Sequence, residues 1–289
     1  MMFGVSPAFV LSLHGHDFSV DDFCEALPRI GRLGFTAYQP EVFHAAALPE
    51  WGRGAHRVHR TAEALGLVPS QFVAHFMLEW FANPERLDPC GGLDELKAVI
   101  DIVHVFSPCR VLTIPAGQFQ MEWDSPATTS EATWRDTRQR LTEKIRRYLE
   151  IVSGAGLRLA FEIMPFSVIG GIRRFLDLCE EIGSPDLGLN FDTGHAWACR
   201  EQVPLLPFEL RTRIFGTHLG DNQSTDNLKL PLGRGTVPWA ALLRNLRAAG
   251  YTGSLDIEIG CPAGEVEHHY RQGLEHLQAL VDTPKGDRA

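Results

Sequence analysis

The chain has 289 residues, of which 44% are hydrophobic and 22% are charged, and its formal net charge is −9. This is the composition of an ordinary soluble globular protein, and the acidic balance argues against a surface built for nucleic acid or for a membrane of anionic lipid. The six cysteines show no CxxC spacing, which argues against a zinc ribbon or a redox pair. The N-terminal residues have no basic region ahead of their short apolar run, so we expect no signal peptide and a cytoplasmic location.

Short apolar runs alternate with longer amphipathic stretches along the whole chain. In chain order, the runs predicted to be strands are FVLSLH near residue 9, FTAYQPEVF, LVPSQFVAHF, RVLTIPAG, LRLAFEIMPF, LGLNFDTGHA, RIFGTHLGDN and SLDIEIG. A helix-like segment follows each run, and the first two of these end at Gly34 and Gly66, where glycine is typical of a helix C-terminus.

This alternation implies parallel strands with right-handed crossovers. Eight such units predict an α/β fold, a single (β/α)8 TIM barrel over residues 1–282, with a flexible tail at 283–289. The competing fold is an open doubly wound sheet, but no GxGxxG follows the first run and no P-loop occurs in the chain.

The last four predicted strands end in residues that commonly bind metal ions: Glu162, Asp192, His218 and Glu258. Active sites of parallel barrels lie at the C-terminal ends of the strands, and a carboxylate inside an apolar strand is costly to bury unless it is paired or bound to a metal. The alternatives are a polar layer neutralised by Arg158 or Lys229 and, for Asp192 alone, a helix N-cap. Three carboxylates and one imidazole favour Mn²⁺, Co²⁺ or Mg²⁺, with catalytic Zn²⁺ also open.

These segments resemble the xylose isomerase-like TIM-barrel superfamily, which includes sugar isomerases, ketose 3-epimerases, inosose-processing enzymes and apurinic-site endonucleases. The resemblance rests on the segments FE, NFDTGH, THLGDN with PLGRGTVPW, and DIE that contain the four residues. It implies that Glu162, Asp192, His218 and Glu258 hold one divalent ion and that Glu162 and Glu258 also serve as an acid–base pair. It further implies that His195 contacts a substrate oxygen; the alternative is that His195 only holds Asp192.

The chain also departs from two branches of this superfamily. Ser224 and Val168 stand where ketose 3-epimerases carry an arginine and a second glutamate, which argues against a typical free-ketose 3-epimerase. Lys229 stands where the trinuclear zinc endonucleases would place a histidine, and the fourth run ends in TIPAG without one. A three-zinc phosphodiesterase is therefore disfavoured.

Three further groups of residues are candidates for the pocket. His75, at the end of QFVAH, is predicted to face the mouth of the barrel and bind substrate. Arg234, in PLGRGT, is predicted to reach an anionic group of the substrate, with a structural salt bridge as the alternative. His14 and His16 follow the first predicted strand and either line the pocket or belong to a polar loop.

The resulting functional prediction is a metal-dependent isomerase or epimerase of a small sugar or polyol, which removes a proton next to a metal-bound carbonyl. A lyase or dehydratase acting on an inosose-like or keto-sugar substrate with the same metal site is the alternative. An apurinic-site endonuclease-like phosphodiesterase and an accessory subunit without turnover are less favoured. Barrels of this type often pair, so a homodimer is the default expectation.

Overall fold

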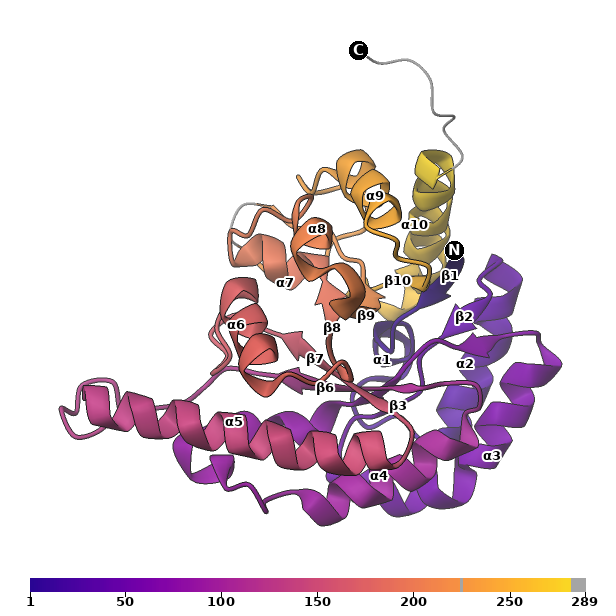
Figure 1. The fold of residues 1–289 in the computed structure, drawn as a ribbon. Coiled ribbons are helices and arrows are strands. Elements are labelled where there is room, and N and C mark those ends of the chain that lie inside the picture. The colour runs from indigo at the N-terminus through magenta and orange to yellow at the C-terminus, as the bar shows by residue number, and fades with distance from the viewer. Residues whose placement is uncertain (224–225, 282–289) are drawn as a thin grey trace.

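Parallel strands run through the centre of the protein, and helices cover their outer faces (Figure 1). The computed structural model describes residues 1–223 and 226–281. The tail predicted at 283–289 and the departure predicted at Ser224 therefore lie outside the described residues.

The strand segments of the described chain form the positions of a barrel, and two of those positions are split. The segments are β1 (Met2–Val5), β2 (Ala37–Tyr38), β3 (Glu41–Val42), β4 (Val68–Pro69), β5 (Phe72–Ala74), β6 (Val111–Ala116), β7 (Arg158–Ile163), β8 (Leu187–Asp192), β9 (Ile214–His218) and β10 (Ser254–Ile257). Their hydrogen-bonded orders are β10-β1-β2-β4 and β3-β5-β6-β7-β8-β9. The pairs β2 with β3 and β4 with β5 are consecutive halves of one strand position each, so they join the two sheets.

Leu219 joins the two ends of the ring. Its N–H donates to the carbonyl of Asp256 at 2.8 Å, and its carbonyl accepts from the N–H of Glu258 at 2.8 Å. These bonds connect the end of β9 to β10, and the predicted (β/α)8 TIM barrel fold is confirmed.

Helices follow the strands in alternation. They are α1 (Ala8–His14), α2 (Val20–Leu33), α3 (Leu48–Ala64), α4 (Leu93–Val105), α5 (Glu131–Gly154), α6 (Ile172–Ile182), α7 (Thr193–Ala198), α8 (Leu206–Leu210), α9 (Trp239–Ala248) and α10 (Val266–Val281), with short 3₁₀ turns at Ala45–Ala47, His75–Phe81, Pro84–Leu87, Arg211–Arg213 and Ala263–Glu265. Local chemistry sets their ends. At α2 the hydroxyl of Ser19 accepts from the N–H of Asp22 while the Asp22 carboxylate accepts from the N–H of Ser19, and Gly34 ends the helix with φ 97°.

The prediction for the first strand is wrong. The sequence pattern places it at FVLSLH, but the structure has the first strand at Met2–Val5 and puts FVLSLH in α1. Phe9 and Val10 are buried in that helix, which begins directly after Pro7. A short apolar run has no periodicity that separates a buried helix from a buried strand, so the pattern alone does not decide between them.

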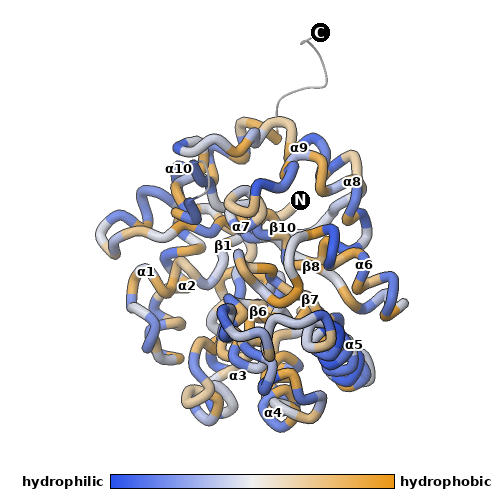
Figure 2. The backbone as a smooth tube through the Cα atoms, turned by 90° about the vertical axis from the view of Figure 1, so that its left-hand side faces the viewer, coloured by the Kyte–Doolittle hydropathy of each residue, from blue (hydrophilic) through white to orange (hydrophobic). Residues whose placement is uncertain are grey.

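Helix α5 illustrates how the outer layer packs. Leu141, Ile145, Tyr148 and Leu149 are among its buried residues and lie at the spacing of one helical face. The helix as a whole is largely hydrophilic (Figure 2). No helix within the described ranges has the length and apolar character that crossing a membrane requires.

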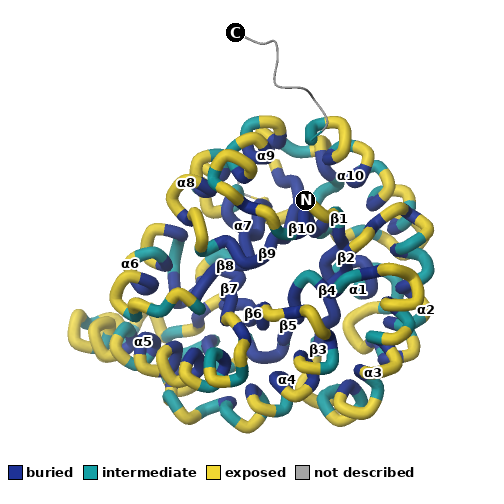
Figure 3. Tube along the Cα trace, turned by 45° about the vertical axis from the view of Figure 1, so that its right-hand side comes forward, coloured by how far each residue is buried: buried dark blue, intermediate teal, exposed yellow. Residues whose placement is uncertain are grey.

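The strands of the barrel are largely buried (Figure 3), and several of their buried residues are polar. Thr113 donates to Gln71 Oε1 at 2.5 Å, and Gln71 Nε2 donates to Asn190 Oδ1 at 2.8 Å. Asn190 Nδ2 in turn donates to Glu162 Oε2 at 3.3 Å. This chain of hydrogen bonds links the barrel interior to the first of the predicted ligands.

Candidate active site

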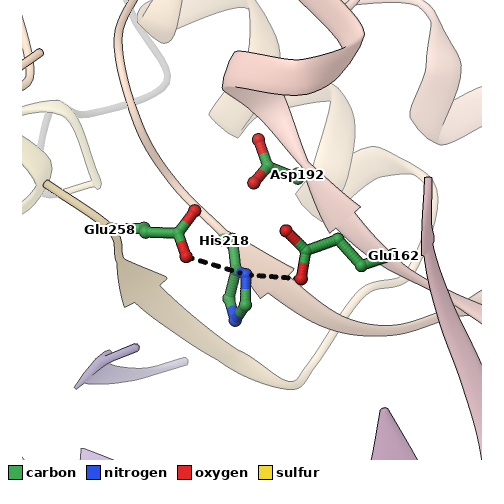
Figure 4. Close-up of side chains that lie close together, drawn as sticks. All are labelled: Glu162, Asp192, His218 and Glu258. Carbon is green, nitrogen blue, oxygen red and sulfur yellow. Dashed lines mark ion pairs between the residues drawn. The ribbon is translucent and has the colours of Figure 1, made fainter. Parts of the chain in front are cut away.

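The C-terminal ends of β7, β8, β9 and β10 bring the four predicted ligands together (Figure 4). Each of Glu162, Asp192, His218 and Glu258 offers one ligand atom, and these atoms all lie within 4.8 Å of one another. The parallel register of β8 and β9 places Asp192 directly beside His218. The sequence spacing therefore translates into a single buried cluster at the mouth of the barrel.

His218 lies at the centre of this cluster. Its Nδ1 is 3.1 Å from Glu162 Oε2 and 3.2 Å from Glu258 Oε1, yet no partner meets the geometry of a hydrogen bond with this buried atom. The opposite nitrogen, Nε2, lies 2.7 Å from Gln39 Oε1, and an Nε2–H donated to this oxygen would fix the ring with Nδ1 toward the carboxylates. Two carboxylates and an orphaned imidazole nitrogen that converge in this way are a donor set that fits a divalent metal ion.

The charges of the cluster depend strongly on one another. Burial disfavours the charged form of His218, but Glu258 and Glu162 outweigh it and raise the pKa of His218 to about 10. Burial likewise opposes ionisation of Glu258, but His218 and Lys229 lower its pKa to about 2. The pKa of Glu162 is also held well below its usual range, because His218 and His195 outweigh its burial. Both glutamates are therefore carboxylates at neutral pH.

Asp192 and His195 are joined by two kinds of contact. Asp192 Oδ1 accepts from the backbone N–H of His195 at 2.7 Å and so caps α7, while Asp192 also belongs to the ligand cluster. Asp192 therefore caps a helix and also takes part in the ligand cluster. His195 Nε2 lies 3.0 Å from Glu162 Oε1 and 3.4 Å from Asp192 Oδ2. Burial raises the pKa of Asp192 to about 6 although His195 and Lys229 oppose this.

Lys229 adds a permanent cation to the cluster. Its Nζ pairs with Asp192 Oδ2 and with Glu258 Oε2. The sequence pattern offers Lys229 only as one counter-ion of a polar layer, and the structure shows that this contact exists. The other suggested counter-ion, Arg158, is exposed and lies over the ring of Phe215 instead.

Residues of the HLGDN and LGRGTVPW segments hold the loop that carries Lys229. Asp221 Oδ2 accepts from the backbone N–H of Gly233 at 2.8 Å and from the indole N–H of Trp239 at 2.9 Å. Asn222 Oδ1 accepts from the backbone N–H of Lys229 at 3.0 Å. These hydrogen bonds fix the loop between the end of β9 and the start of α9, and the fixed loop places the Lys229 ammonium beside Asp192 and Glu258.

A cavity of ≈ 260 Å³ opens beside the cluster, and Glu162, His218, Glu258, His195 and Lys229 contribute to its wall. Of the further candidates, His75 and His16 line this cavity, whereas His14 pairs with Asp22 at 3.5 Å. Arg234 is exposed and does not line the cavity, so the structure brings it to no contact with the cluster. The substrate-binding roles of His195, His75 and Arg234 stay predictions.

Glu41, Phe43 and Gln39 are residues of this region that the sequence analysis missed. Glu41 and Phe43 line the cavity, and the ring of Phe43 stacks on that of His75 at a centroid distance of 4.0 Å. Burial lowers the pKa of His75 to about 4, so this ring is uncharged at neutral pH. A carboxylate inside an apolar run is the signal that picks out Glu162 and Glu258, and the same signal in AYQPEVF points to Glu41.

Comparison with known proteins agrees with this architecture. A family model described as "Xylose isomerase-like TIM barrel" matches residues 27–280. The L-ribulose-5-phosphate 3-epimerase UlaE of Escherichia coli is 27% identical over 133 residues, which are 45% of this chain and 46% of that protein. The chain spans less than half the length of the curated relatives it matches first.

Two solved structures share the fold over nearly the whole chain. The 3-keto-D-glucoside 4-epimerase of E. coli has a TM-score of 0.73 at 17% identity and covers 96% of this chain and 99% of its own. The IolI protein with a bound zinc atom has a TM-score of 0.72 at 12% identity and covers 98% of this chain and 100% of its own. At these identities the likeness establishes the fold alone.

Proposed function

We propose that this chain, which belongs to the xylose isomerase-like TIM barrel family, is a divalent-metal-dependent isomerase or epimerase of a sugar or polyol. The observation that carries the proposal is the convergence of Glu162, Asp192, His218 and Glu258, with ligand atoms within 4.8 Å of one another, beside a cavity. One ion held by these four residues is the expected cofactor, and Mn²⁺ suits their donor set best, with Co²⁺, Mg²⁺ or Zn²⁺ as alternatives. The sugar epimerase among the relatives supports a small carbohydrate as substrate.

The ion, when bound, supplies Lewis-acid polarisation of a substrate carbonyl. Glu162 and Glu258 act on the carbon next to that carbonyl. They enter the cavity wall from β7 and from the end of β10, on either side of His218 (Figure 4). One glutamate accepts the proton as a carboxylate, and the other, after taking up a proton from solvent in the cavity, delivers it to the substrate. His195, which holds Glu162, faces the same cavity and contacts a substrate oxygen.

Metal content and Mn²⁺ titration test the proposed site. We expect about one equivalent of tightly bound ion in the wild type and much weaker binding in Glu258→Gln, since the substitution removes a charged ligand. Glu209→Gln, on the exposed surface of α8, is the matched control and should bind as the wild type does. A wild-type protein that binds no divalent metal would refute the mechanism.

Turnover is tested by the exchange of carbon-bound hydrogen for deuterium in D₂O, followed by NMR on ketoses and inososes. Exchange without loss of mass supports an isomerase or epimerase. A product lighter by one water would replace the proposal with the lyase or dehydratase alternative, because a substrate that has lost its proton can instead expel a β-hydroxyl. Three equivalents of zinc together with nicking of an abasic duplex would replace it with the phosphodiesterase.

A further inference from the structure

Glu41 is a buried carboxyl group that no other described residue pairs. It lies on β3, is 2% exposed, and its Oε2 is buried without a hydrogen-bond partner. The same residue contributes to the wall of the cavity beside the cluster of predicted metal ligands. A polar group that is taken out of water and given no partner is costly, and in a cavity wall the natural partner is a group of the ligand.

Burial favours the protonated form of Glu41. It raises the pKa of this carboxyl well above its usual value, with Glu258 and Glu162 acting in the same direction and His218 against them. A carboxyl oxygen accepts a hydrogen bond from a hydroxyl group in either form, and a protonated carboxyl also donates one. The unpaired Oε2 in the cavity wall is therefore a matched partner for a substrate hydroxyl.

The charges in the cavity wall are unfavourable for a phosphate ester. Lys229 is the single lysine or arginine among the described residues of the wall, and its ammonium is already paired with Asp192 and Glu258. Arg234, the cation that the sequence analysis suggests for an anionic group, lies outside the wall. Apart from Lys229 and the proposed metal ion, the described wall offers a phosphate dianion no lysine or arginine and presents three carboxyl groups to it, whereas sites that recognise phosphate present arginine, lysine or backbone N–H groups.

Aromatic rings also line the wall of the cavity. Phe43 stacks between the rings of His75 and His16, at centroid distances of 4.0 Å and 4.7 Å. The cavity of ≈ 260 Å³ lies near the lower end of the volumes typical of small-molecule sites, as suits a small ligand.

We infer that Glu41 is a substrate-binding group that exchanges a hydrogen bond with a substrate hydroxyl, and that the substrate is an uncharged keto-sugar or polyol derivative. This inference rests on the proposed function, because it concerns the ligand of the same site. The inferred substrate differs from that of the relative UlaE, which is named for a sugar 5-phosphate.

Calorimetry on the Mn²⁺-loaded full chain tests the inference without requiring turnover. Sorbitol and sorbitol 6-phosphate are the probes, since neither has a carbonyl to react. We expect sorbitol to bind the wild type at least tenfold more tightly than its phosphate. Glu41→Leu should weaken sorbitol binding about tenfold, and Glu41→Gln, which keeps a donor and an acceptor, should restore most of it. Glu63→Gln, exposed on α3, is the control that should change nothing.

Deuterium exchange with fructose and fructose 6-phosphate separates this inference from the proposed function. If sorbitol 6-phosphate binds as well as sorbitol, or if fructose 6-phosphate exchanges its carbon-bound hydrogen as fast as fructose, the inference is overturned and the proposed isomerase or epimerase stays in place. Binding of sorbitol within twofold of the wild type in a folded Glu41→Leu variant would remove Glu41 from the substrate site. Selective binding of sorbitol without exchange on any sugar would support the inference and refute the proposed function.

Discussion

Replacing Lys229 with methionine removes a cation from the carboxylate cluster and keeps most of the length of the side chain. Lys229 pairs with Asp192, whose side chain is 1% exposed, and with Glu258, whose side chain is 13% exposed. Removing one partner of a buried ion pair costs about 3–5 kcal/mol. Because Glu258 and Lys229 keep some access to solvent in the cavity, we expect the lower end, about 3 kcal/mol, as the loss of unfolding free energy in the metal-free protein.

The same substitution should strengthen metal binding. Two unit charges at 4 Å interact by about 4 kcal/mol at an effective dielectric constant of 20, and a divalent ion doubles this repulsion. Lys229 therefore relieves the repulsion by leaving the carboxylates, which costs the roughly 3 kcal/mol that its pairing contributes. Without Lys229 this cost disappears, so Mn²⁺ should bind about a hundredfold more tightly, since 1.4 kcal/mol corresponds to a factor of ten. The unfolding free energy of the Mn²⁺-loaded protein should then change by less than about 1 kcal/mol.

Calorimetric Mn²⁺ titration measures the change in affinity. Urea unfolding with and without the ion measures the change in stability of the Mn²⁺-loaded and the metal-free protein. Lys97→Met is the control, because Lys97 lies on α4 with its side chain 59% exposed and pairs only with its exposed neighbour Asp94. Weaker Mn²⁺ binding in Lys229→Met would show that the ammonium organises the ligands rather than competing with the ion. An unchanged affinity together with an unchanged metal-free stability would show that the ion pairs contribute nothing.

Three further substitutions probe other contacts. Gln39→Leu removes the acceptor that holds His218 Nε2 and should lower Mn²⁺ affinity roughly 10- to 100-fold. A variant that binds Mn²⁺ as tightly as the wild type in calorimetry would count against this role of Gln39. Lys144→Met leaves three backbone carbonyls without the ammonium that donates to them at 2.7–2.9 Å, and urea unfolding should show a loss of about 3 kcal/mol; a loss below about 1 kcal/mol would contradict the assignment. The folded pKa of His75 is about 4 against 6.5, so the unfolded chain binds more protons between these values and the protein loses stability as pH falls from about 6.5 to 4. His75→Gln should remove up to roughly 3 kcal/mol of this loss, whereas His268→Gln, exposed on α10, should leave the pH dependence of urea unfolding as it is in the wild type.

The ligand cluster can be predicted from the sequence because a buried carboxylate is visible there as an acidic residue inside an apolar strand run. Glu162 and Glu258 each interrupt an apolar strand run, and Asp192 and His218 end the two runs between them. Once the alternation of strands and helices implies a parallel barrel, all four must lie at one end of it. No side-chain geometry is needed for that step, which is why the predicted set and the observed cluster coincide.

The same reasoning fails where a residue's place depends on a loop or on a distant element. FVLSLH is apolar enough for either a strand or a helix, and its packing in the barrel, not its periodicity, makes it α1. Arg234 and Lys229 belong to one loop, and the sequence suggests Arg234 for an anionic group of the substrate and Lys229 as a counter-ion of the carboxylates. The hydrogen bonds of Asp221 and Asn222 turn Lys229 into the cluster, while Arg234 is left exposed.

By itself, therefore, the sequence determined the barrel and the residues whose burial is chemically costly, because both follow from patterns along single strands. Only the tertiary structure decided which groups face those residues. Gln39 meets His218 at 2.7 Å, although 179 positions separate them in the chain. Glu41 is left without a partner at the cavity wall. The physical reason is that a hydrogen bond or an ion pair depends on distances of a few ångströms across the barrel, and these are set by how all the strands close, not by any one of them.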